Sequence, residues 1–197
     1  MRIVLRGGLE LEDPLETTIR FVQAYPAYDA RDSRPGSFDE SDLRHANRGG
    51  ARISAAQIAA ILERRRRIER ALRSIAPEAS LAEEPIPWES LTRLFDAFAG
   101  ISGIGFSKVT KALHPKRRAL IPMLDIVVQS YLGTDEPKAP FAERGTTLVR
   151  SYKQDLDRNL AALRRVQRDL VSRGHASLTE VRILDVLIWS AYAPTAR

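Results

Sequence analysis

The sequence predicts an all-α protein, built as a two-lobed helical bundle. Apolar side chains recur every three or four residues through most of the chain, which is the spacing of one buried helix face. Several of these segments begin at a proline or a capping residue and stop near a glycine, as helices commonly do. A strand pattern is confined to residues 3–11, where two apolar runs flank Gly7-Gly8 and predict a short β-hairpin. We expect a single domain over 1–197 whose lobes are approximately 1–50 plus 141–197, and 51–140.

The helices predicted in the N-terminal half follow three start signals. Asp13-Pro14 begins a helix that runs to about residue 25, because proline favours the first helical position. A loop over residues 26–37 leads to Ser37 and Glu40, which are spaced as a capping box for a short helix. After Ser54, apolar residues at helical spacing predict one longer helix that continues to about residue 75.

The C-terminal half contains the other predicted helices. Three prolines in residues 76–87 indicate a linker, and Pro87 then begins a helix that Gly100 ends. Ser177 and Glu180 are spaced as a second capping box, which marks the last helix. Two further helices are expected between these segments, over residues 126–132 and 144–172.

Composition bounds the class of protein. The net charge is +6 and the isoelectric point is about 10.0, which is common in nucleic-acid-binding domains, although an arginine-rich composition alone can also produce it. The absence of cysteine excludes disulfides, a thiol nucleophile and an iron–sulfur cluster. No window resembles a membrane span and the charged N-terminus does not resemble a secretory signal, so we expect a cytoplasmic protein that does not enter a membrane. No metal site is predicted, because no ligand spacing relates the histidines, His45, His114 and His175.

The segment Ile101-Ser102-Gly103-Ile104-Gly105 predicts a tight hairpin between two helices. Glycine permits positive φ and close backbone approach, while the two isoleucines are expected to hold the turn in the core. Backbone N–H groups at the start of the second helix would then face outward, where they favour a phosphate group. The alternative is an ordinary glycine-rich turn, or a helix cap after Gly100.

A basic segment follows the hairpin. It carries Lys108, Lys111, Lys116, Arg117 and Arg118 and no acidic residue. Beside a phosphate-binding hairpin, these side chains would neutralise a nucleic-acid backbone with an affinity that falls as salt rises. The alternative is a solvated loop, which is the usual place of a charge run.

Asp125 begins an apolar segment twenty positions after Gly105. An aspartate at a helix N-cap is among the commonest structural uses of this residue. Its spacing from the hairpin supports a second interpretation, in which the carboxylate serves a site beside the hairpin. Arg182 and Asp185 lie three positions apart on the last helix and are interpreted as a structural ion pair.

This order and spacing resemble the helix-hairpin-helix, Gly/Pro-rich loop and aspartate (HhH-GPD) superfamily of DNA glycosylases. Gly103-Ile104-Gly105 resembles the hairpin core of that superfamily, and Ile121–Asp125 is similar to the loop of its adenine-mismatch branch. The resemblance is close over residues 100–128, and elsewhere only the helical plan is compatible. The whole chain also resembles a bacterial family of uncharacterised proteins with an Arg-x-Leu-Asp-x-x-Ile-Trp pattern, found here at Arg182–Trp189.

The resemblance implies a role in DNA repair on double-stranded DNA, with Asp125 as the catalytic carboxylate at the sugar of a flipped base. Bifunctional members carry a lysine at the position of Ser107, so it implies hydrolysis without strand-nicking lyase activity. It further implies a monovalent cation at the hairpin and no other cofactor, since the cluster-binding cysteines of several branches are absent. The DNA-binding residues that it implies are Ser102, Gly103, Ile104, Gly105, Ser107, Lys108, Lys111, Lys116 and Arg117.

The chemistry agrees with this interpretation. Cleavage of an N-glycosidic bond builds positive charge on the sugar, and one ionised carboxylate can stabilise that charge and orient a water molecule. The base must also leave the stack, but the sequence does not identify its pocket or a wedge residue. Candidates for this pocket or wedge are Tyr28, His114, Gln129 and Tyr131.

Two alternatives to a glycosylase remain. One is a non-catalytic helix-hairpin-helix DNA-binding module in which Asp125 only caps a helix, and the other is a protein–protein interaction domain.

Overall fold

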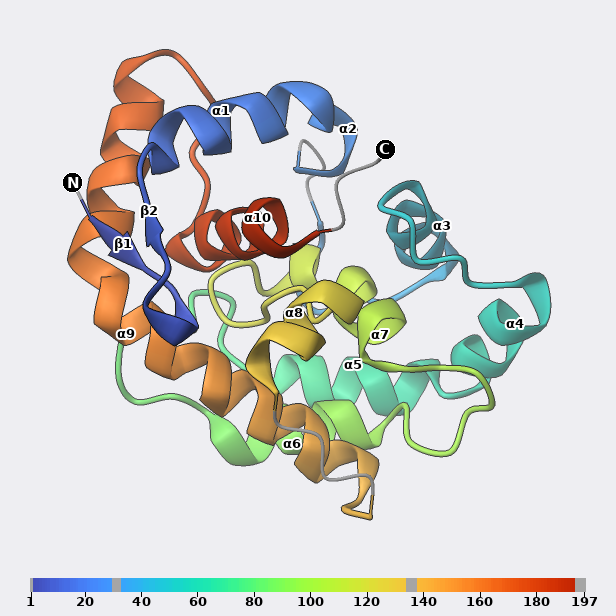
Figure 1. Cartoon of the computed structure of the whole chain (residues 1–197). Coiled ribbons are helices and arrows are strands. Elements are labelled where there is room, and N and C mark those ends of the chain that lie inside the picture. Colours follow the sequence, from blue (N-terminus) through green and yellow to red (C-terminus); the bar gives the residue numbers. More distant parts are fainter. Residues whose placement is uncertain (1, 30–32, 134–137, 194–197) are drawn as a thin grey trace.

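The computed structural model describes residues 2–29, 33–133 and 138–193, and helices dominate it (Figure 1). The prediction of an all-α protein with a short N-terminal hairpin is confirmed. Strand β1 (Ile3–Val4) pairs antiparallel with β2 (Glu10–Leu11) across the 3-10 turn η1 (Arg6–Gly8). The helices are α1 (Pro14–Ala24), α2 (Pro26–Asp29), α3 (Glu40–Arg48), α4 (Ala55–Glu63), α5 (Arg65–Arg73), α6 (Trp88–Asp96), α7 (Phe106–Leu113), the 3-10 turn η2 (His114–Lys116), α8 (Ile126–Leu132), α9 (Phe141–Ser172) and α10 (Glu180–Tyr192).

Three helix starts differ from the prediction, and one of them is α9, which begins at Phe141 instead of at residue 144. Helix α3 begins after Asp39, because the Asp39 side chain accepts from the Ser41 N–H group and the Asp42 side chain accepts in return from the Asp39 N–H group. Helix α10 begins after Thr179, whose hydroxyl oxygen accepts from the Arg182 N–H group. The capping boxes predicted at Ser37 and Ser177 are therefore wrong. The loop predicted over residues 26–37 also contains the short helix α2.

The long helix predicted after Ser54 is divided at Arg64. Ser54 and Gln57 form the capping box of α4, and Arg64, with φ −96° and ψ 7°, separates α4 from α5. The guanidinium group of Arg64 donates to the Ala99 carbonyl oxygen in the turn after α6. Helix α5 packs against α6, while α4 presents Gln57 to the hairpin that follows α6.

Helix α9 is the longest element and packs against both α6 and α10 (Figure 1). It approaches α6 closely at Gly145, where a Cβ atom would lie 2.9 Å from the Phe95 ring and 3.0 Å from the Phe106 ring. A side chain at this position would have to displace both rings from a close-packed core. One buried hydrophobic cluster extends through helices of both predicted lobes, and the division into two lobes stays a prediction.

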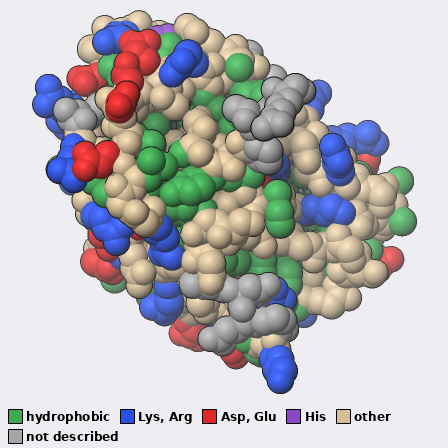
Figure 2. All heavy atoms as spheres, in the orientation of Figure 1, with side chains coloured by type: hydrophobic (Ala, Val, Ile, Leu, Met, Phe, Trp, Pro, Cys, Tyr) green, Lys and Arg blue, Asp and Glu red, His purple; other side chains and the backbone are tan. Residues whose placement is uncertain are grey.

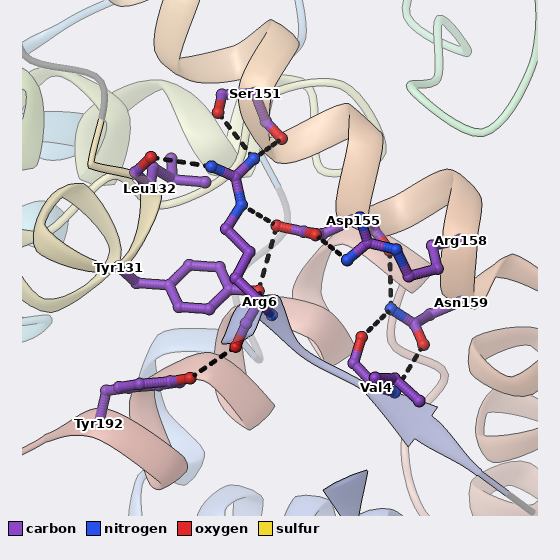
Figure 3. Close-up of polar contacts among 9 residues, drawn as sticks. All are labelled: Val4, Arg6, Tyr131, Leu132, Ser151, Asp155, Arg158, Asn159 and Tyr192. Atoms are coloured by element: carbon purple, nitrogen blue, oxygen red, sulfur yellow. Dashed lines mark hydrogen bonds and ion pairs between the residues drawn. The ribbon is translucent and has the colours of Figure 1, made fainter. Parts of the chain in front are cut away.

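An arginine network joins α8 to α9 (Figure 3). Arg6 Nε donates to Asp155 Oδ2 at 2.6 Å, Nη1 donates to the Leu132 carbonyl oxygen at 2.8 Å, and Nη2 donates to the Ser151 carbonyl oxygen at 2.6 Å. The Tyr131 hydroxyl accepts from the Arg6 N–H group at 2.9 Å and donates to Asp155 Oδ2 at 3.1 Å. The buried Asp155 carboxylate is therefore paired, as a buried charge must be. The network anchors the C-terminal end of α8, the helix that begins after Asp125.

The surface has a mixed character on the face shown in Figure 2. Charged side chains lie mainly around its periphery, whereas hydrophobic side chains are visible across its middle. Within the described ranges, no helix is both long and apolar enough to cross a membrane. Large hydrophobic residues exposed to solvent include Leu9, Tyr25, Ile126, Val171 and Tyr192.

Candidate functional site

The predicted hairpin lies between α6 and α7. Gly103 has φ +68°, a conformation that disfavours other residues, whereas Gly105 has an extended backbone (φ −112°, ψ 178°) at the N-cap of α7. Ile101 and Ile104 are buried, as expected, and hold the turn in the core. Gly103, Gly105 and Ser102 are exposed. The hairpin is therefore a turn that is anchored in the core and has an accessible tip.

Helix α4 supports the hairpin through Gln57. Its side-chain amide donates to the Gly103 carbonyl oxygen at 3.2 Å, and its Oε1 atom accepts from Lys108 Nζ at 2.8 Å. Lys108 Nζ also donates to the Gly103 carbonyl oxygen at 2.9 Å. Two side-chain donors therefore already occupy the Gly103 carbonyl oxygen, and the monovalent cation implied at the hairpin stays a prediction.

The start of α7 presents free backbone donors. In the part of the chain that the structure describes, no acceptor is found for the N–H groups of Gly105, Phe106 and Ser107, and no side chain caps the helix. Such donors at the positive end of a helix dipole favour an anion. Phe106 is buried, so the exposed Gly105 and the half-buried Ser107 bound the position that an anion would take.

Two of the predicted DNA contacts are buried, and the expectation that they belong to an exposed basic loop is wrong. Lys116 Nζ pairs with Asp42 Oδ1 at 2.9 Å, and neither side chain is more than 3% exposed. Arg117 is 2% exposed and donates to the carbonyl oxygens of Leu72 and Ile75, each at 2.6 Å. The Leu72 oxygen also accepts from the Ile75 N–H group at 3.2 Å, so Arg117 adds a side-chain donor at the end of α5 instead of facing solvent.

Asp125 is the N-cap of α8. Its Oδ1 atom accepts from the N–H groups of Val127 and Val128, each at 3.0 Å. Among the described residues, no hydrogen-bond donor is found for Oδ2, and the side chain is half-buried at the edge of a pocket. One carboxylate oxygen therefore fixes the helix, while the carboxyl group borders a cavity.

This pocket has a volume of about 470 Å³, which lies in the usual range of ligand sites. It is lined from both predicted lobes. Four aromatic rings form part of its wall, and Phe21, Tyr25 and Trp189 contact one another with centroids 4.9–6.1 Å apart. The residues that line it are Phe21, Ala24, Tyr25, Tyr28, Arg48, Gly49, Gly50, Lys111, Met123, Asp125, Val128, Arg182, Asp185 and Trp189.

Helix α7 connects the hairpin with the pocket. Lys111 lines the pocket and lies one helical turn after Ser107 and Lys108, on the same side of the helix. Burial lowers the pKa of Lys111, and the negative charge of Asp125 acts in the opposite direction. The negative charge of Asp125 therefore stabilises the charged form of Lys111 within the site.

The predicted ion pair between Arg182 and Asp185 does not form. Arg182 instead pairs with Asp29, with Nε–Oδ1 and Nη2–Oδ2 distances of 2.8 Å. Asp185 Oδ2 accepts from the Met123 N–H group at 3.0 Å, and burial raises the Asp185 pKa to about 8 despite the opposing charge of Arg182. Both side chains line the pocket.

The other candidates divide between the pocket and the core. Tyr28 lines the pocket, and its hydroxyl donates to the Lys111 carbonyl oxygen at 2.6 Å. His114 is buried with Nδ1 2.7 Å from the Ile121 carbonyl oxygen, and Tyr131 belongs to the Arg6 network. The Gln129 side chain donates to the Leu124 carbonyl oxygen at 2.8 Å. No group of three metal-ligating side chains occurs in the described ranges, so the histidines do not share a site.

Several pocket residues were not predicted from the sequence. Arg182 and Asp185 lie in a segment of α10 whose residues are all buried. A charged side chain in such a segment needs a specific partner, which is a signal of a structural or functional site. Arg52 gives a different signal, because it is exposed with φ +55°, a strained conformation for a residue other than glycine. It lies in the loop between Gly50, which lines the pocket, and α4, which supports the hairpin.

Comparison with known proteins places the chain in a family. No curated protein and no solved structure matches it. A family model described as "Family of unknown function (DUF6308)" matches residues 16–192. The matched residues include the hairpin, Asp125 and all of α10. The chain belongs to the DUF6308 family.

Proposed function

We propose that the protein is a DNA glycosylase of the HhH-GPD type, which hydrolyses the N-glycosidic bond of a base flipped out of double-stranded DNA. The observation that carries the proposal is that Asp125 borders an aromatic pocket of about 470 Å³, and that α7 runs from the hairpin to Lys111 in the wall of the same pocket. A pocket with aromatic walls suits a planar base, and the adjacent carboxylate suits the sugar to which that base is attached.

The hairpin and its neighbours would hold the DNA backbone. The N–H groups at Gly105 and Ser107 favour a phosphate oxygen, and the exposed Arg52 adds positive charge in the neighbouring loop. Lys108 braces the hairpin and Lys111 lines the pocket, so both raise the local positive potential. Ser102, Gly103 and Ile104 would shape the turn.

Asp125 would act on the reacting sugar as an ionised carboxylate. Positive charge develops on the sugar as the bond to the base breaks, and a nearby carboxylate stabilises it and orients a water molecule. Ser107 occupies the position of the lyase lysine, so we expect base release without strand nicking. The proposed reaction uses only the protein's own side chains and a water molecule, and it requires no cofactor. We propose that the protein acts in DNA repair in the cytoplasm.

A non-catalytic DNA-binding module is the second candidate. It is favoured by one observation, that Asp125 Oδ1 already accepts two backbone hydrogen bonds at the start of α8. In this function the hairpin binds duplex DNA, and Asp125 has no role beyond the helix cap.

The substitution Asp125→Asn separates the two functions. Asparagine caps helices about as well as aspartate, so the variant keeps α8 but loses the negative charge. We expect it to bind duplex DNA as the wild type does and to release no base from a panel of damaged and mismatched duplexes. Asp13→Asn is the matched control, because Asp13 caps α1 through the Glu16 N–H group and does not line the pocket.

The control should keep full activity. If the wild type releases no base from any duplex but still binds DNA, the binding module replaces the glycosylase. A wild type with no salt-dependent affinity for DNA would remove both functions and leave a protein–protein interaction domain.

A further inference from the structure

The pocket contains a second carboxyl group that has no role in the proposed reaction. Asp185 on α10 is 2% exposed and lines the pocket together with Asp125. Its Oδ2 atom accepts from the Met123 N–H group, while Oδ1 has no partner among the described residues. A buried polar atom without a partner is costly, so a ligand that satisfies Oδ1 would gain affinity from it.

We propose that Asp185 carries a proton on Oδ1 and donates a hydrogen bond to the ligand of the pocket, selecting planar heterocycles that offer an acceptor nitrogen or carbonyl oxygen at their inner edge. The proposed function identifies the ligand as a nucleobase, and the inference rests on it for that identity. The recognition itself depends only on Asp185 and the aromatic wall.

The surroundings of Asp185 support its neutral form. Burial raises its pKa to about 8, so the carboxyl group is mostly protonated near neutral pH. Arg182 on α10 opposes this shift, but its guanidinium group is held by Asp29 through two hydrogen bonds of 2.8 Å. Asp125 at the start of α8 is a second negative charge that raises the Asp185 pKa.

The remaining titratable neighbours do not supply a proton in its place. Tyr152 on α9 lies beside Asp185 and acts to lower its pKa, but the Tyr152 hydroxyl donates its hydrogen bond to the Val181 carbonyl oxygen at 2.6 Å. Tyr28 on α2 donates to the Lys111 carbonyl oxygen, and burial raises the pKa of both tyrosines. Among the pocket residues that the structure describes, Lys111 on α7 has a lowered pKa, so a variant at Lys111 serves as the control for its titration.

The test uses two flat probes of the same shape, quinoline and naphthalene, which differ by one acceptor nitrogen. Binding is followed through Trp189 fluorescence in a Trp88→Phe background, because Trp189 lines the pocket and Trp88 lies beneath Arg150 outside it. We expect quinoline to bind about tenfold more tightly than naphthalene at neutral pH, and the difference to vanish as the pH rises through about 8.

Asp185→Asn makes the test specific. The asparagine carbonyl can accept from the Met123 N–H group while its amide donates into the pocket without titrating. The variant should therefore keep the preference for quinoline at both neutral and alkaline pH, and Asp185→Leu should lose it. Lys111→Gln should leave the pH profile unchanged.

Equal affinities of wild type for the two probes would overturn the inference without any variant. It would also be overturned if Asp185→Asn kept the wild-type pH profile, or if Lys111→Gln abolished it. No DNA is present in this assay, so its outcome is independent of base release. If the probes bind as expected but the protein never releases a base, the role of Asp185 in recognition is supported and the proposed glycosylase activity is rejected.

Discussion

Arg182 and Asp29 form a bidentate ion pair in which Nε and Nη2 donate to the two carboxylate oxygens, each at 2.8 Å. The pair joins α10 to α2, elements from opposite ends of the chain. The Arg182 guanidinium group also lies 5.2 Å from the Phe21 ring centroid and 5.6 Å from that of Tyr28. One side chain therefore fixes two aromatic walls of the pocket.

Arg182→Met should destabilise the protein strongly. Both partners are largely buried, and removal of one leaves an unpaired buried charge, which typically costs about 3–5 kcal/mol. The free energy of unfolding from urea titration measures this loss. The double variant Asp29→Asn with Arg182→Met should recover part of it. Arg93→Met is the control, because it breaks an exposed pair with Glu89 and should lower the free energy of unfolding by less than about 1 kcal/mol. An equal loss of unfolding free energy in both arginine variants would contradict the prediction.

Gly103→Ala should weaken DNA binding by about tenfold. The residue has φ +68°, which costs about 1–2 kcal/mol for alanine, and the added Cβ would lie 2.5 Å from Gln57 Nε2. The displaced Gln57 can no longer brace the hairpin. Gly174→Ala is the matched control, with φ +77° and no neighbour within 4 Å. It should lose a similar amount of stability from the backbone alone and keep its affinity for duplex DNA, as measured by fluorescence anisotropy.

Arg52→Asn should reduce the salt dependence of DNA binding. The change removes one exposed positive charge, and asparagine tolerates the φ of +55° at this position. The slope of log affinity against log salt concentration should fall by about 1, with little change in the free energy of unfolding. Lys138→Gln removes an exposed charge from the segment between α8 and α9. An equal change of slope in the two variants would show that Arg52 acts only through net charge.

His114 should make stability depend on pH in the acid range. Burial lowers its pKa to about 4 from 6.5, so between these values the unfolded chain binds a proton that the folded protein does not. The stabilisation is complete above pH 6.5 and is lost as the pH falls toward 4. Asparagine in place of His114 can still donate to the Ile121 carbonyl oxygen and does not titrate.

The stability of wild type relative to His114→Asn should therefore fall by about 3 kcal/mol across this range. Urea denaturation of both proteins at a series of pH values measures the difference. A difference that does not change with pH would show that His114 is not held neutral by burial.

Features that depend on a few neighbouring residues could be predicted from the sequence. The N-terminal hairpin and the start of α1 at Asp13-Pro14 follow from local backbone chemistry, and the sequence predicts both; the glycines of the second hairpin permit the positive φ that Gly103 adopts. Predicted caps were wrong where two candidates lie close together, as at Ser37 and Asp39. The all-α class follows from the same short-range periodicity.

The site itself depended on contacts between distant segments. Nothing in the sequence around Lys116 and Arg117 shows that they turn inward to Asp42 and to the carbonyl oxygens at the end of α5. In the same way, Arg182 pairs with Asp29 and leaves Asp185 in the pocket. Local spacing determined the hairpin and the position of Asp125 at a helix start, because capping acts within one turn. Only the tertiary structure decided which charges are buried and what Asp125 borders, because burial depends on how distant helices pack.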